Sequence, residues 1–371
     1  MSEEFQPVAQ PHLWGNERIY LDEALESGWV SSRGPFIERF ERAFAESIGV
    51  AHAVSVTNCT NALHLALDAL GIGPGDEVIV PDFTMMAPVF AVLYQRATPV
   101  PIDADETWNM DPDAVAVAIT PRTRAILAVH TYGHPARIDR LREIADEHNL
   151  WLVEDAAEAH GGAVLGRAVG TFGDIACFSF YANKLITTGE GGMIITNCEE
   201  LAKRVRWKRN MCFGSDEESR YTHESIGFNY RMTNLQAAIG LAQLENAAAA
   251  LESKLSIAQA YDAALGEIPG LTLPPRSTWA KNVFWVYGVL IRDEFGRSRV
   301  ELQQRLSSRK IETRRFFTPL HRQPVIRSNG SLLSFPNADL LCERGLYLPS
   351  FPCMSTSVIQ RVADEIRRAR G

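Results

Sequence analysis

Two residues suited to amine chemistry each follow an apolar run with the composition of a β-strand. Asp155 comes directly after residues 152–154, and Lys184 lies about thirty residues later, just beyond the run 175–180. In parallel α/β sheets, ligand sites form at the carboxyl ends of the strands. A lysine amine can form a Schiff base with the aldehyde of pyridoxal phosphate, while an aspartate pairs with the protonated pyridine nitrogen. Once released, the lysine can move protons as a general acid–base.

Taken singly, these two residues are weak signals. An isolated lysine is usually a surface residue, and an aspartate after a strand commonly caps a helix. The neighbouring glycine-rich loop, residues 189–192, strengthens the interpretation, because Lys184 lies in the connection that contains it.

The elements that position these residues are predicted from alternating apolar and amphipathic segments, which indicate repeated βα units. Five apolar runs are predicted strands, at residues 53–56, 77–80, 99–102, 125–129 and 150–153. The runs 175–180 and 193–196 have no helix between them and predict a strand pair bridged by the loop with Lys184. We therefore expect a mixed, mainly parallel sheet that is buried on both faces.

The second part of the chain has a different character. Residues 235–265 are rich in alanine and have the apolar spacing of one long helix, and the run 283–291 predicts a strand. A chain of 371 residues exceeds what one hydrophobic core usually serves. We expect an α/β fold with a large cofactor-binding domain, residues 1–245, and a smaller α+β domain, residues 246–371.

The charge balance argues against nucleic acid as a partner. The formal net charge is −8, whereas a general nucleic-acid binder needs clustered excess Lys and Arg. The one dense basic run, residues 203–209, is interpreted as a solvated helix face, with a local contact to a substrate diphosphate as the alternative.

The cysteines and the termini suggest a cytoplasmic location. Six cysteines are dispersed without a Cys-x-x-Cys pair, which is typical of reduced thiols and predicts neither a disulfide framework nor a metal site. The first residues are acidic and lack the pattern of a signal peptide. No apolar stretch approaches the length of a membrane span, so no membrane partner is expected.

Linked motifs at residues 153–161, 178–184 and 187–193 resemble the sugar aminotransferase family within the aspartate aminotransferase fold type, fold type I. The resemblance extends over nearly the whole chain, from residue 11 to residue 352. It implies a pyridoxal-phosphate-dependent aminotransferase with a large and a small domain.

The resemblance also implies roles for individual residues. Lys184 matches the Schiff-base lysine, and Asp155 matches the partner of the pyridine nitrogen. Glu158 matches a position beside the ring hydroxyl of the cofactor, and Ser179 matches a phosphate ligand. For Ser179, a hydrogen bond from a strand serine to the backbone is the alternative.

Residues 57–63 resemble the family's phosphate-binding turn, in which free N–H groups and the helix dipole converge. Asn58, Cys59 and Thr60 are thus candidate cofactor ligands, although Thr60 is also consistent with a plain helix cap. The family usually has glycine where this chain has Cys59.

Met85 stands where many relatives place an aromatic that stacks on the pyridine ring. A thioether can pack on that ring, and ordinary core is the alternative.

Residues 227–232 match a segment that reaches from one subunit into the site of the other. Asn229 would then contact the phosphate of the neighbouring cofactor, which implies a homodimer with shared active sites. Arg231 is a candidate substrate ligand, with a structural ion pair as the alternative.

Two segments, residues 128–135 and 310–321, are similar to the perosamine synthase subgroup. That subgroup aminates C-4 of a 4-keto-6-deoxymannose attached to GDP, with L-glutamate as amino donor. His130, Arg314 and His321 are therefore candidate substrate ligands, Arg314 because a guanidinium binds phosphates and carboxylates in bidentate geometry. For Arg314 and His321, a surface loop is the alternative. Another nucleotide-linked keto sugar as substrate also stays open.

Two other functions compete with amine transfer. A lyase subgroup of the same fold dehydrates the sugar, but it has His in place of the Schiff-base lysine, and position 184 is Lys. A non-catalytic regulator that retained the fold would be expected to have altered the lysine or gained a basic DNA-binding extension. Neither feature is visible in the sequence.

Overall fold

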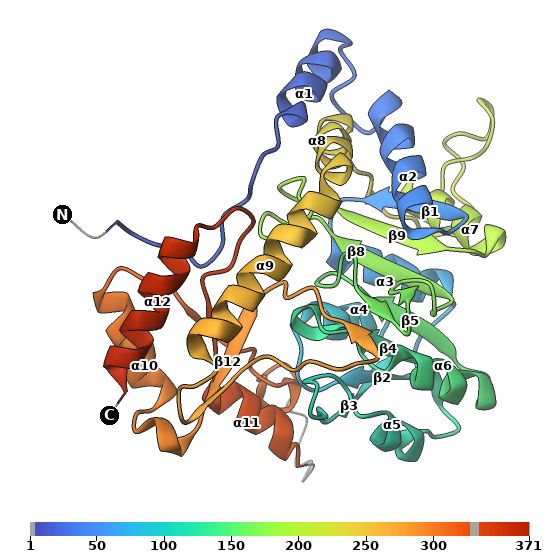
Figure 1. Cartoon of the computed structure of the whole chain (residues 1–371). Coiled ribbons are helices and arrows are strands. Elements are labelled where there is room, and N and C mark those ends of the chain that lie inside the picture. Colours follow the sequence, from blue (N-terminus) through green and yellow to red (C-terminus); the bar gives the residue numbers. More distant parts are fainter. Residues whose placement is uncertain (1–3, 327–333, 371) are drawn as a thin grey trace.

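The computed structural model describes residues 4–326 and 334–370 (Figure 1). Its centre is a seven-stranded sheet in the order β1-β9-β8-β5-β4-β2-β3. The strands are β1 (His52–Val56), β9 (Gly192–Thr196), β8 (Ile175–Ser179), β5 (Trp151–Asp155), β4 (Thr123–Val129), β2 (Glu77–Pro81) and β3 (Thr98–Ile102).

Strand directions follow from the connections. The pairs β2–β3, β2–β4, β4–β5 and β5–β8 are parallel. β9 pairs antiparallel with both β8 and β1, because a loop rather than a helical crossover joins β8 to β9. The prediction of a mixed, mainly parallel sheet is confirmed.

Helices cover both faces of this sheet (Figure 1). One face packs against α3 (Cys59–Ala69), α4 (Ala87–Tyr94) and α7 (Glu199–Arg209). The opposite face packs against α2 (Pro35–Ile48) and α8 (Asn234–Glu245) over one half, and against α5 (Pro112–Ala118) and α6 (Ile138–Glu147) over the other. Successive residues of one strand separate accordingly, since Val54 faces the first group of helices and Ala53 faces the second.

The second part of the chain contains a smaller, four-stranded antiparallel sheet in the order β10-β12-β14-β13. Its strands are β10 (Leu271–Thr272), β12 (Tyr287–Ile291), β14 (Gly345–Leu348) and β13 (Arg314–Arg315). It shares a buried core with α9 (Ala247–Leu265), α10 (Arg299–Ser308) and α12 (Thr356–Ala369). The division between residues 245 and 246 stays a prediction.

The remaining elements are short or peripheral. β6 (Ala163–Val164), β7 (Arg167–Ala168) and β11 (Ala280–Lys281) form a three-stranded sheet. α1 (Asn16–Glu26) lies against α8 at one end of the molecule (Figure 1). α11 (Pro336–Arg344) lies beside the four-stranded sheet, and the 3-10 turns are η1 (Thr131–Gly133), η2 (Asp293–Phe295) and η3 (Leu320–Arg322).

Two expected elements differ from the structure. The single helix over 235–265 is wrong, because Asn246 leaves the helical region (φ −111°, ψ 10°) and separates α8 from α9. Its side-chain amide donates to the carbonyl oxygen of Ala242, which satisfies an acceptor at the end of α8. The strand predicted over 283–291 begins only at Tyr287, because Phe284 has a positive φ of 49°.

The prediction that the basic run in α7 is a solvated face holds only in part, because Lys203 and Arg204 are exposed, whereas Arg206, Lys208 and Arg209 are half-buried. Arg204, Arg206 and Arg209 each donate a hydrogen bond to a backbone carbonyl oxygen of α3 or β1. These guanidinium groups therefore attach α7 to its neighbours. Within the described ranges, no helix is long and apolar enough to cross a membrane, and no group of His, Cys, Asp and Glu residues is arranged to hold a metal ion.

We predict that Leu63→Ala lowers the free energy of unfolding by about 2–5 kcal/mol, because the Leu63 side chain is fully buried between α3 and the sheet. Urea unfolding measures the change. Val117→Ala serves as the control, since Val117 is 87 % exposed, and should change stability by no more than about 0.5 kcal/mol. Equal losses in the two variants would contradict the packing described above.

Candidate active site

The sheet brings an amine and two carboxylates together at its carboxyl edge. Lys184 follows β8, Asp155 is the last residue of β5, and β5 and β8 are adjacent. Lys184 Nζ lies 3.6 Å from Glu158 Oε1, and the two side chains are only 9 % and 7 % exposed. The structure thus places three of the residues singled out from sequence in one buried cluster.

Burial dominates the electrostatics of this cluster. Loss of hydration raises the pKa of Glu158 from its ordinary 4.5 to about 7, although the Lys184 ammonium acts in the opposite direction. Burial likewise lowers the pKa of Lys184 and raises the pKa of Asp155. All three shifts favour the neutral forms, because the cost of removing water from the charges exceeds their attraction.

Asp155 keeps one oxygen for a ligand. Its Oδ1 accepts a hydrogen bond from the Ala157 N–H at 3.0 Å and lies 3.9 Å from Cys59 Sγ. Among the described residues, no donor reaches its second oxygen, Oδ2. A buried carboxylate with one unused oxygen at a strand end suits the protonated nitrogen of a pyridine ring.

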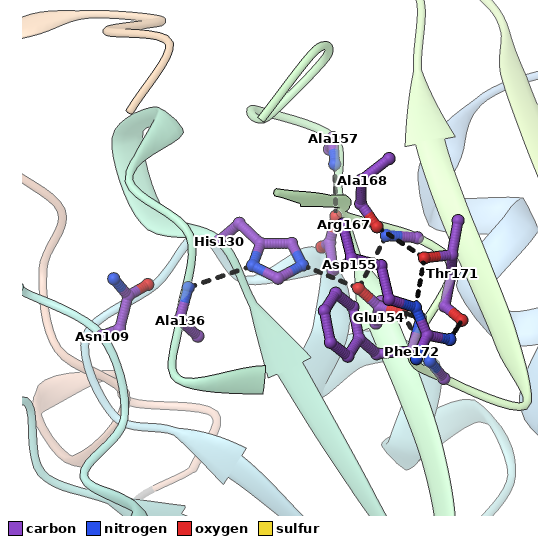
Figure 2. Close-up of polar contacts among 12 residues, drawn as sticks. Asn109, His130, Ala136, Glu154, Asp155, Ala157, Arg167, Ala168, Thr171 and Phe172 are labelled. Carbon is purple, nitrogen blue, oxygen red and sulfur yellow. Dashed lines mark hydrogen bonds and ion pairs between the residues drawn. The ribbon is translucent and has the colours of Figure 1, made fainter. Parts of the chain in front are cut away.

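His130 contacts Glu154 and Ala136 (Figure 2). The ring is fully buried, its Nε2 lies 3.1 Å from Glu154 Oε2, and its Nδ1 accepts the N–H of Ala136. The expectation that His130 binds substrate is therefore wrong, because both ring nitrogens are used within the protein. The Glu154 carboxylate also accepts the N–H groups of Gly170, Phe172 and Gly173, which secures the strand end next to Asp155 (Figure 2).

The start of α3 forms a cradle for a phosphate. The first N–H groups of a helix have no partner within the helix, and Asn58 Oδ1 caps only the N–H of Asn61. Gly192 adjoins this turn so closely that a Cβ on it would lie 2.7 Å from the Asn58 carbonyl carbon. Gly192 is also the register partner of Ser179 on β8, so the Ser179 hydroxyl and the helix N-terminus share one side of the site.

The structure shows where the two residues that depart from the family pattern, Cys59 and Met85, lie, and which residue caps α3. Asn58 is the N-cap of α3, so the interpretation of Thr60 as the cap is wrong, and Thr60 is half-buried in the first turn. Cys59 is buried with its thiol toward Asp155, and burial raises its pKa well above the ordinary value. Met85 is 49 % exposed, so the core alternative for it is wrong.

The 227–232 segment presents Asn229 outward. Asn229 is exposed, and its neighbours Phe228 and Tyr230 stack on each other at 5.0 Å. Arg231 donates from Nε and Nη2 to Asn229 Oδ1, at 3.0 and 2.6 Å, and from Nη1 to Asn210 Oδ1. Arg231 makes no ion pair with any carboxylate of the described chain, so that alternative is wrong.

The remaining candidates, Arg314 and His321, come from the second part of the chain. Arg314 has a side chain 57 % exposed and an ion pair with Glu312 at 3.3 Å. His321 is not in a free surface loop, because its Nδ1 lies 2.7 Å from Asp82 Oδ2 and its Nε2 lies 3.2 Å from Asp339 Oδ1. Both ring nitrogens of His321 therefore have protein partners.

Trp285 and Tyr132 also belong to the site, although neither was predicted from the sequence. The face of Trp285 lies 3.5 Å from Lys184 Nζ, measured to the ring centroid. The N–H of Tyr132, a residue with φ of 56°, donates to Glu158 Oε2 at 2.8 Å. No local motif marks Trp285, which is part of an apolar run, whereas Tyr132 lies inside a segment that already resembled the family.

The fold and the site define an aminotransferase. The chain belongs to the DegT/DnrJ/EryC1/StrS aminotransferase family, whose model matches residues 13–367, and it is a pyridoxal-phosphate-dependent sugar aminotransferase. Its residues fit this cofactor, because the cradle at α3, the unused oxygen of Asp155 and the buried amine of Lys184 suit a phosphate, a pyridine nitrogen and an aldehyde.

Two sequence relatives and one solved structure are similar to this chain over nearly their whole length. The chain is 46 % identical to the GDP-perosamine synthase of Caulobacter vibrioides, over 96 % of this chain and 95 % of that one. It is 43 % identical to the GDP-perosamine synthase of Escherichia coli O157:H7, over 97 % of each chain. The crystal structure of DesV from S. venezuelae matches with a TM-score of 0.89 and 38 % identity, over 95 % of this chain and 93 % of that chain.

We predict that Glu158→Gln flattens the pH dependence of stability in the full chain without bound cofactor. The pKa of Glu158 rises on folding from 4.5 to about 7, so the native state holds a proton that the unfolded state has lost. This contribution to stability is complete below pH 4.5 and is lost as the pH rises through 7, by roughly 1–3 kcal/mol. Urea unfolding at intervals from pH 5 to 8 measures it.

Glu267→Gln, at an exposed position, is the matched control and should retain the wild-type slope. A wild-type slope in the Glu158→Gln variant would show that Glu158 does not titrate in this range.

Proposed function

We propose that the protein transfers the amino group of L-glutamate to C-4 of a nucleotide-linked 4-keto-6-deoxy sugar, with GDP-4-keto-6-deoxymannose as substrate and GDP-perosamine as product. The observation that carries the proposal is the buried amine of Lys184 beside Glu158 and Asp155 at the carboxyl edge of the sheet. The names of the relatives at 43 % and 46 % identity support the choice of sugar.

Pyridoxal phosphate supplies an aldehyde that receives the amino group and a ring that holds the electrons released from the Cα–H bond. In our proposal, the N–H groups of Cys59 and Thr60, with the Ser179 hydroxyl, bind its phosphate. Asp155 would pair with the protonated pyridine nitrogen, and Glu158 would face the ring hydroxyl. Met85, which is partly exposed, lines the entrance through which the substrates reach the cofactor.

Lys184 moves the proton. Burial lowers the pKa of its amine, so a larger fraction of Nζ is neutral and able to accept the Cα proton of glutamate. With the sugar bound, Nζ returns a proton to the sugar carbon that receives the amine. One site therefore serves the two substrates in turn, which predicts ping-pong kinetics.

We further propose that the active unit is a homodimer. The exposed Asn229 has its Oδ1 occupied by Arg231, so its amide N–H₂ is left to donate to an anion, and we assign it to the cofactor phosphate of the second subunit. Arg231 and Arg314 are the proposed sources of positive charge for the substrate, since guanidinium groups bind phosphates and carboxylates. For His321 we propose a role in holding the loop after β2 through Asp82.

We predict two separable half-reactions. Glutamate alone should abolish the visible absorbance of the lysine-bound cofactor and release one 2-oxoglutarate per site. Added GDP-4-keto-6-deoxymannose should restore the absorbance, whereas the UDP- and dTDP-linked 4-keto sugars should restore it at least about tenfold more slowly. Lys184→Ala should lack the absorbance and both reactions.

Restoration by a UDP- or dTDP-linked sugar at the faster rate would reassign the substrate. Loss of water from the sugar without net amine transfer would indicate a dehydratase, and no response to glutamate would indicate a regulator.

We predict that Lys184→Ala and Asn229→Ala complement each other. In a mixed dimer, the Lys184-bearing site of one subunit receives the intact Asn229 of the other. Co-expressed in equal amounts, the two inactive variants should regain about a quarter of wild-type activity, because one mixed-dimer site in two is complete and half the dimers are mixed.

Lys184→Ala mixed with Asp155→Asn is the control. These two residues come from the same chain in every site, so this pair should regain nothing. Equal behaviour of the two mixtures would show that Asn229 does not act across the interface.

A further inference from the structure

Lys184 lies against an aromatic face that belongs to a distant part of the chain. Its Nζ is 3.5 Å from the ring centroid of Trp285, just before β12, and Glu158 Oε1 is 3.6 Å away. An ammonium over an indole face is attracted by the ring quadrupole, more strongly when water is excluded. The amine thus has a defined resting place between a carboxylate and an aromatic ring.

Trp285 is fixed independently of Lys184. Its indole Nε1 donates to the carbonyl oxygen of Asn183 at 2.9 Å, which ties the ring to the loop next to Lys184. Its own carbonyl oxygen accepts from Lys254 Nζ at 3.1 Å. The ring also packs against Tyr132, with centroids 6.3 Å apart. Contacts at both ends of the residue hold the ring face in place.

Lys254 is a buried cation that serves this arrangement. It is 3 % exposed, and its Nζ donates to the carbonyl oxygens of Trp285 and Ser350 and to the Ser350 hydroxyl. Burial lowers its pKa to about 7. A buried ammonium persists only where oxygens replace its water, and here one of those oxygens is the backbone carbonyl of Trp285, while the other two belong to Ser350.

We propose that Trp285 is a positioning residue for the transamination lysine: its indole face receives the amine of Lys184 whenever that amine is free and protonated. The proposal rests on the proposed function of Lys184. By holding Nζ beside Glu158 between the two half-reactions, Trp285 keeps the amine at the reacting centre instead of letting it rotate away. Lys254 supports this role through the Trp285 backbone.

The other titratable groups that face the amine act from different elements. They are Glu158 and Asp155, which favour the ammonium, and Cys59, whose thiolate form would do the same. His160 is also close enough to be affected by Lys184. None of these groups is changed by substitution of Trp285, so the effect of the ring face can be measured separately.

The first test measures the amine directly. In the full chain without bound cofactor, the rate of trace acetylation of Lys184 by acetic anhydride is followed against pH by mass spectrometry, and its midpoint gives the pKa of the amine. Trp285→Leu removes the attraction for the ammonium, so the midpoint should fall by about one unit. Trp285→Phe, which retains a weaker aromatic face, should shift it less. Trp151→Leu, at an exposed tryptophan, should leave it unchanged.

The second test uses the holoenzyme. Trp285→Leu should reduce kcat about tenfold with the KM values for both substrates within about twofold of wild type, and Trp285→Phe should recover part of kcat. Circular dichroism of each variant checks folding. An unchanged or higher midpoint in Trp285→Leu, or an unchanged kcat, would overturn the proposal. The acetylation midpoint does not depend on amine transfer, so failure of the proposed function would appear separately, as a wild-type enzyme that does not respond to glutamate.

Discussion

The cost of placing charged groups in a site without water governs this structure. Lys184 and Glu158 lie 3.6 Å apart and almost fully buried, and burial displaces the pKa of each toward its neutral form. An amine that is to accept a proton needs this suppression of its charge, and the same suppression makes the site costly to maintain. The rest of the fold supplies the rigid surroundings that keep these groups dry and close.

Two supports act from inside the large sheet. Glu154, the residue before Asp155, forms a buried pair with His130, and its carboxylate also accepts backbone N–H groups from the turn between β7 and β8. Gly192 lets β9 approach the start of α3 to a distance that a Cβ would not permit. The carboxylate for the ring nitrogen and the cradle for the phosphate are thus both set by backbone geometry, which does not reorganise during a reaction.

The second part of the chain contributes side chains that contact Lys184 directly or through one neighbour. α9 carries Lys254, whose ammonium joins the carbonyl oxygens of Trp285 and Ser350, and Trp285 in turn faces Lys184. A movement of the small sheet relative to the large one would therefore change the distance between the Trp285 ring and the Lys184 amine. Asn229, in contrast, is exposed on the surface of its own chain.

The sequence by itself determined the mainly parallel sheet, the positions of Asp155 and Lys184 at strand ends, and the family, because apolar periodicity and linked motifs are local properties of the chain. It did not determine where side chains point: the ring of His130 is buried against Glu154, although its segment is similar to the perosamine synthase subgroup and made it a candidate substrate ligand. The break at Asn246 depends on local backbone angles that an alanine-rich pattern conceals. Trp285 became visible as the neighbour of Lys184 only in the tertiary structure, because about a hundred residues separate them and packing alone brings the indole face to the amine.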